Sequence, residues 1–120
     1  MTQPSIISPK ILENPIWLAD VTRADEWIRE ILGKFADSKS WEWEVKVDSA
    51  GRPNYDIRIV YEVSSISERF NRFEIGNKKL FTRRMTSAWG LLLDDVFAVD
   101  RRRFAETVRE WNAEEAAVAN

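Results

Sequence analysis

Histidine and cysteine are both absent from the 120 residues of this chain. Histidine is the commonest metal ligand and titrates nearest to neutral pH, while cysteine supplies thiolate nucleophiles and most structural zinc sites. Their absence excludes Ser-His-Asp and Cys-His catalysis, zinc fingers, haem held by either residue, and disulfide bonds. We therefore expect the hydrophobic core to stabilise the fold without disulfides, which suits a reducing cytoplasm.

Several other signals are missing. The first residues, MTQPSIISPK, lack the basic stretch and apolar run of a signal peptide, and no run of about 18 apolar residues predicts a membrane span. The chain has no Ser-x-x-Lys, no glycine-rich phosphate loop and no dinucleotide fingerprint. Neighbouring acids such as Asp94 and Asp95 cannot face one another on a helix. We expect a cytoplasmic protein that is not an enzyme and holds no metal or cofactor.

What the chain has in abundance is large rings. With 44% hydrophobic and 32% charged residues, it has the composition and the length of one globular domain. We expect residues 1–10, which include Pro4 and Pro9, to form a flexible segment, and residues 11–118 to form a single globular domain. Most of the six tryptophans should pack in its core. They are Trp17, Trp27, Trp41, Trp43, Trp89 and Trp111.

The first elements are a short apolar segment and a helix. Two apolar stretches, Ile11-Leu12 and residues 16–18, are separated by a break at Pro15. This segment covers either the chain's own core or a second subunit, so a homodimer through residues 11–18 is an open alternative. Thr22 can cap a helix whose apolar residues recur every three or four positions up to Phe35. This pattern predicts an amphipathic helix with one buried side.

Two segments alternate between apolar and polar residues and predict an antiparallel hairpin. Residues 41–47 and 55–63 have period two, and residues 48–54 between them have turn chemistry. Trp41 and Trp43 share the face that a helix should cover. Residues 64–79 fit either a helix or a third strand at about 69–75, and a third strand would complete a stable sheet.

From Leu80 onward the apolar period is helical, and a second stripe runs through Phe104, Val108 and Trp111. One unbroken helix over residues 80–118 would be about 58 Å long, roughly twice the width of a small domain. We therefore expect a break near residues 99–100. The predicted fold is α+β: an N-terminal amphipathic helix, a two- or three-stranded antiparallel sheet, and two C-terminal helices packed on the sheet.

The net charge is −2, but positive charge is concentrated in two segments. Residues 69–84 hold six cations against one acid, and three arginines follow at 101–103. Cations near a helix N-terminus cost about 0.3–1 kcal/mol each, because the macrodipole is already positive there. Since both segments open an expected helix, we expect a phosphate or a partner's carboxylate to compensate them. This basic strip comprises Arg69, Arg72, Lys78, Lys79, Arg83, Arg84, Arg101, Arg102 and Arg103.

The order helix, two or three strands, helix, with Lys78 and Lys79 opening the last helix, resembles that of double-stranded-RNA-binding domains over residues 22–98. The resemblance implies that the basic strip binds phosphates. The sequence departs from that family where bulky Leu80 follows the lysines and where the loop 51–54 contains no histidine.

Two functions follow from the basic strip. The first is a non-catalytic, small cytosolic interaction protein, of the inhibitor, immunity or chaperone and adaptor kind, which binds an acidic protein surface. The alternative is a nucleic-acid-binding protein that uses the same strip on phosphates, without reading base edges.

Overall fold

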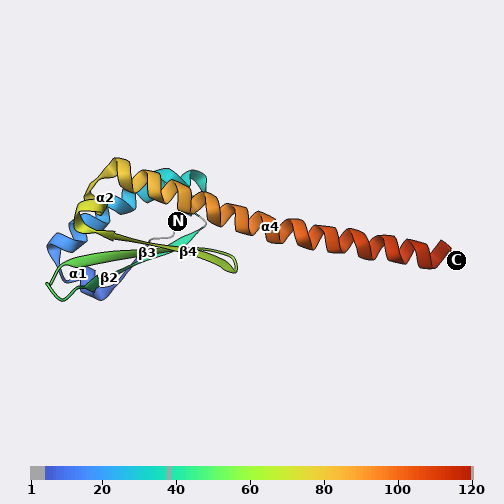
Figure 1. Ribbon diagram of the computed structural model, residues 1–120, viewed down its shortest axis with the longest axis horizontal. Helices are drawn as coiled ribbons and strands as arrows, with labels where there is room; N and C mark the ends of the chain where they lie inside the picture. Colours follow the sequence, from blue (N-terminus) through green and yellow to red (C-terminus); the bar gives the residue numbers. More distant parts are fainter. Residues whose placement is uncertain (1–4, 38, 120) are drawn as a thin grey trace.

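The fold is α+β, with one sheet covered on one face by helices and with a long helix that continues away from this body (Figure 1). The computed structural model describes residues 5–37 and 39–119, without the side chains of 99–100 and 117–119. The elements are β1 (Ile6–Ile7), α1 (Pro9–Leu12), α2 (Pro15–Leu32), the 3-10 helix η1 (Gly33–Asp37), β2 (Ser40–Val47), β3 (Pro53–Tyr61), β4 (Ser64–Asn71), α3 (Arg72–Gly76) and α4 (Lys78–Ala119).

The sheet has four strands in the order β1-β2-β3-β4 and is mixed. Strands β2, β3 and β4 are antiparallel, as expected, but β1 pairs with β2 in parallel. We expected two or three antiparallel strands, and the sheet instead has a fourth, short strand that is parallel to its neighbour. It comes from the segment 1–10 that was expected to be flexible, of which residues 1–4 lie outside the described residues.

The segment after the hairpin is a strand first and a helix second. Strand β4 pairs with β3 along its whole length, so the expected third strand exists, but it begins earlier, at Ser64, and ends at Asn71. It ends there because a capping box starts α3. The Asn71 side chain accepts a hydrogen bond from the Glu74 backbone N–H, and the Glu74 carboxylate accepts one from the Asn71 N–H.

Helix α2 begins seven residues before the expected cap at Thr22. Its N-cap is Asn14, whose Oδ1 accepts hydrogen bonds from the N–H groups of Ile16 and Trp17 at 3.1 and 3.2 Å. Pro15, which was expected to break the N-terminal apolar segment, occupies the first helical position. Its missing N–H is not needed there, because a backbone N–H at this position has no partner within the helix. The N-terminal apolar segment, residues 11–18, covers the chain's own core in part, because Ile11 is fully buried while Ile16 stays exposed.

Helix α4 is continuous through residues 99–100, and the expected break there was wrong. The two C-terminal helices that pack on the sheet are α3 and α4. At 42 residues, α4 is about 63 Å long, which explains why the molecule measures 72 Å along its longest axis. The break was expected because both parts of the helix were assumed to pack on one body. Instead α4 leaves the body, so that Trp111 is 60% exposed rather than part of the core.

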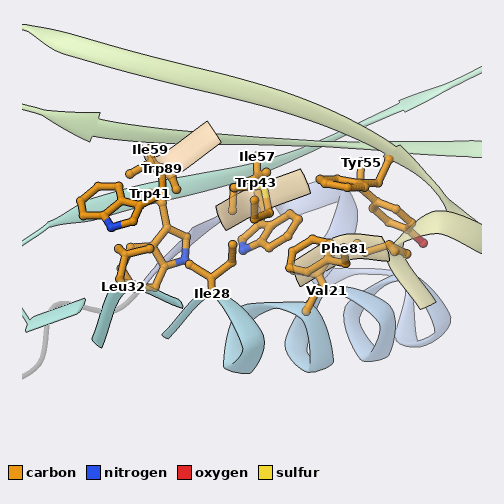
Figure 2. Close-up of a cluster of buried hydrophobic side chains, with 14 of the residues drawn as sticks. Val21, Ile28, Leu32, Trp41, Trp43, Tyr55, Ile57, Ile59, Phe81 and Trp89 are labelled. Carbon is orange, nitrogen blue, oxygen red and sulfur yellow. The ribbon is translucent and has the colours of Figure 1, made fainter. Parts of the chain in front are cut away.

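The core lies between the sheet and helices α2 and α4 (Figure 2). Trp41 and Trp43 are 1% exposed, which confirms that helices cover their face of the sheet. Phe81 of α4 packs against the rings of Trp43 and Phe70, with centroid distances of 6.4 and 4.7 Å. The expected α4 stripe is buried throughout. It consists of Phe81, Met85, Ala88, Trp89, Leu92 and Val96.

Candidate binding surface

Two acids of α2 lie in the core and serve the fold. The Asp25 carboxylate accepts hydrogen bonds from the indole N–H groups of Trp41 and Trp43, at 2.6 and 3.0 Å, and from Arg29 at 3.2 Å. A single oxygen, Oδ1, thus satisfies two buried donors on β2, while Oδ2 accepts from Arg29. The sequence signal for this role is that Asp25 falls on the apolar side of its helix, three residues before Ile28.

Asp20 has the equivalent role at the other end of the core. Its carboxylate accepts hydrogen bonds from the Tyr55 hydroxyl at 2.9 Å, from Arg72 at 3.0 Å and from Arg23 at 3.4 Å. Burial of the Tyr55 phenol raises its pKa, and the hydrogen bond to Asp20 raises it further. Both buried acids are therefore occupied by donors from the chain itself.

The uncovered face of the sheet is polar and balanced in charge. Arg58 of β3 contacts Glu42 of β2 at 3.3 Å, and Arg69 of β4 donates two hydrogen bonds to Asp56 of β3 at 2.6 and 3.1 Å. The hydrogen bond to Asp56 raises the pKa of the Arg69 guanidinium. This face presents cross-strand ion pairs rather than a surface of one sign.

Arg84 joins three elements of the fold. Its guanidinium donates to Glu68 of β4 at 2.8 Å, to Glu74 of α3 at 3.0 Å and to the Arg69 carbonyl at 2.9 Å. It also lies 4.2 Å from the centroid of the Phe70 ring. With these partners its charge is already compensated, so Arg84 positions α4 on the sheet.

The structure divides the basic strip into paired and unpaired cations, and it does not gather them on one patch. Besides Arg84 and Arg69, Arg72 contacts Asp20 at 3.0 Å and Lys78 contacts Glu30 at 3.7 Å. Among the side chains that the structure describes, in residues 5–37, 39–98 and 101–116, the other cations of the strip form no ion pair with an acid. They are Lys79, Arg83, Arg101, Arg102 and Arg103, all exposed and all on α4.

Helix geometry brings three of these unpaired cations to one side of α4. Lys79 and Arg83 are four residues apart, and Arg83 and Arg101 are eighteen residues apart, which is about five turns. Phe81 and Met85 point into the core from the opposite side. We call the side that carries Lys79, Arg83 and Arg101 the outward side of α4.

Beyond the body, the outward side is apolar as well as basic. Val96 is the last residue of α4 with a buried side chain in the described part of the chain. We call residues 97–119 the arm, which Figure 1 shows as a free helix. On the arm, Phe97, Phe104 and Trp111 are 46%, 67% and 60% exposed. Single exposed apolar residues are ordinary, but three rings on one side of a free helix make that side a candidate contact surface.

The described residues contain no group of three or more acids that could hold a metal ion, and no helix among them is long and apolar enough to cross a membrane. Comparisons with protein-family models, with curated proteins and with solved structures find no match to this chain.

Proposed function

We propose that this protein is a non-catalytic interaction protein of the cytoplasm, of the inhibitor, immunity or adaptor kind, and that it binds an acidic protein surface through the outward side of α4. The observation that carries the proposal is the separation of cations. Arg69, Arg72 and Arg84 contact acids of the chain itself, whereas Lys79 and Arg83 are exposed and contact no acid in the described part of the chain.

The position of these two cations strengthens the proposal. Lys79 lies in the first turn of α4, where the macrodipole disfavours positive charge by about 0.3–1 kcal/mol, and Arg83 lies beside it one turn later. A bound carboxylate would remove this cost. The same argument no longer applies to Arg101, Arg102 and Arg103, because α4 has no terminus near them.

The exposed rings of the arm favour a protein that makes protein contacts over one that binds nucleic acid. Phe104 and Trp111 provide exposed apolar surface, and aromatic anchors beside arginines are typical of protein interfaces.

The test compares an acidic polypeptide with a nucleic acid. Binding of a fluorescent poly-glutamate peptide and of a duplex RNA of similar charge is measured for the wild type and for Lys79→Ala/Arg83→Ala. The control is Lys46→Ala/Arg58→Ala, which removes the same charge from the uncovered sheet face. We expect the first variant to bind the peptide about fivefold or more weakly, because each exposed charge contact contributes roughly 0.5–1 kcal/mol.

The control variant should bind the peptide like the wild type, and duplex RNA should bind to none of the three proteins. Equal losses in both variants would show that net charge alone drives binding, and the proposed surface would then be wrong. Tight binding of duplex RNA, falling steeply with salt, would replace the proposal with the nucleic-acid alternative.

A further inference from the structure

We propose that the arms of two copies of this chain pair side by side in opposite directions and hold the protein as an antiparallel homodimer. The occupant of the exposed apolar stripe is therefore a second copy of the same arm. This interface is separate from the acid-binding role of Lys79 and Arg83, which lie on the part of α4 that covers the core.

The spacing of the stripe is that of a two-helix seam. Phe97, Phe104 and Trp111 follow one another at intervals of seven residues, and Val108 lies four residues after Phe104. Residues repeating every seven positions stay on one side of a helix, which is the pattern that packs two helices together. The rings of the arm cannot pack against the core of their own chain, because the buried side chains of α4 end at Val96 in the described part of the chain.

The charges along the arm decide the direction of pairing. On the side of the apolar stripe, Arg101 lies near its start and Glu115 near its end, whereas Arg102, Arg103, Glu110 and Glu114 lie on other sides of the helix. In a parallel pair, Arg101 would lie beside Arg101 of the other copy and Glu115 beside its Glu115, which is destabilising. In an antiparallel pair, Arg101 of each arm lies near Glu115 of the other. Charge complementarity therefore selects the antiparallel arrangement.

The apolar residues set the register. Opposing Phe104 of one copy to Val108 of the other places two such apolar layers at the centre. The same register opposes Arg101 to Trp111 of the other copy, where a guanidinium can stack on the indole, and brings Glu115 within one helical turn of Arg101. The arm is about 35 Å long, so each end reaches the other copy's body.

The area available to this seam predicts a reversible dimer. Three rings per copy are half to two-thirds exposed, and a fully buried ring contributes about 150–250 Å². Six rings therefore bury on the order of 600 Å² beyond what the single chain buries, which is below a standard stable interface unless aliphatic parts of flanking side chains add to it. We expect dissociation at micromolar concentrations. Arg102 and Arg103 remain outside the seam, together with Lys79 and Arg83.

The first experiment measures mass by sedimentation equilibrium between about 1 and 200 μM, a range that brackets such an interface. The wild type should approach twice its 14.0 kDa at the upper end. Phe104→Ala/Trp111→Ala should raise the dimer dissociation constant by at least about tenfold, because central aromatic residues dominate interface energies. The matched control is Phe73→Ala, which removes a ring that is 77% exposed on α3. It should dimerise like the wild type.

A charge exchange tests direction. Arg101→Glu should weaken the dimer, because it places a carboxylate at position 101 near Glu115 of the other copy, and Glu115→Arg should weaken it in the same way. The double variant Arg101→Glu/Glu115→Arg should restore the dimer, since opposite charges again meet in the antiparallel pair. In a parallel pair, each position would face the same position of the other copy, so like charges would meet in every variant and the single exchanges would not weaken the dimer.

Single cysteines give an independent answer, because the natural chain has none to interfere. In the proposed register, Ala105→Cys lies near the twofold axis and should form a disulfide-linked dimer under mild oxidation, whereas Glu115→Cys should not. A wild type that stays monomeric at about 200 μM, or a crosslink at position 115 without one at position 105, would overturn the proposal. Neither result would affect peptide binding by Lys79 and Arg83.

Discussion

Removing the Asp25 carboxylate should destabilise the fold more than any surface change on α2. In the folded protein this side chain is 8% exposed, and it accepts both indole N–H groups of Trp41 and Trp43. Asp25→Ala leaves two buried donors without an acceptor, at about 1–3 kcal/mol each. We therefore expect the free energy of unfolding to fall by about 3–5 kcal/mol.

Asp25→Asn is the matched control. Its amide oxygen can still accept from both indoles, while the ion pair with Arg29 at 3.2 Å is lost. Since that pair is partly exposed, we expect a loss of only about 1–2 kcal/mol. Urea unfolding followed by tryptophan fluorescence and by circular dichroism measures both variants. If Asp25→Ala proved no more destabilising than Asp25→Asn, the carboxylate would not be the acceptor that the core requires.

Three further predictions concern other parts of the fold. Because the raised pKa of Tyr55 keeps its phenol protonated in the folded state, the free energy of unfolding should fall above about pH 10, by at most about 1.4 kcal/mol per pH unit. Tyr55→Phe should remove this pH dependence, as measured by urea unfolding from about pH 9 to 11.5. Glu62 has a φ of 56° in the turn between β3 and β4, so Glu62→Gly should raise the free energy of unfolding by about 0.5–1 kcal/mol; a decrease would contradict this assignment of strain. Arg84→Ala should lower it by about 1–2 kcal/mol, because Glu68 and Glu74 lose their shared partner, whereas Arg58→Ala on the open face should lower it by less than about 1 kcal/mol in the same denaturation assay.

The elements that could be predicted from the sequence are those with a strong local period. The alternation around Trp41 and Trp43 predicted β2 and its covered face, and the stripe from Phe81 to Val96 predicted the buried side of α4. The start of α2 was missed because Pro15 is compatible with both a chain break and a first helical position. Strand β1 was missed because two residues, Ile6–Ile7, have no period to detect.

The candidate site was predictable as a set of cations but not as a surface. Positive charge is visible in the sequence, whereas the acids that neutralise it are distant along the chain. Arg72 contacts Asp20, which lies 52 residues earlier, and Arg69 contacts Asp56 on the next strand. The exposure of Phe104 and Trp111 was missed for a related reason, since an apolar stripe does not indicate whether its own chain or another one covers it.

The claim that this protein works by what the outward side of α4 contacts is tested most directly by photocrosslinking in the cells that make it. A photoreactive amino acid replaces Arg83 in one variant and Arg58, on the open sheet face, in the other. We predict covalent protein adducts at position 83, with contact peptides rich in aspartate and glutamate, and none at position 58. Adducts at position 58 alone, or nucleic acid attached at position 83, would contradict the claim.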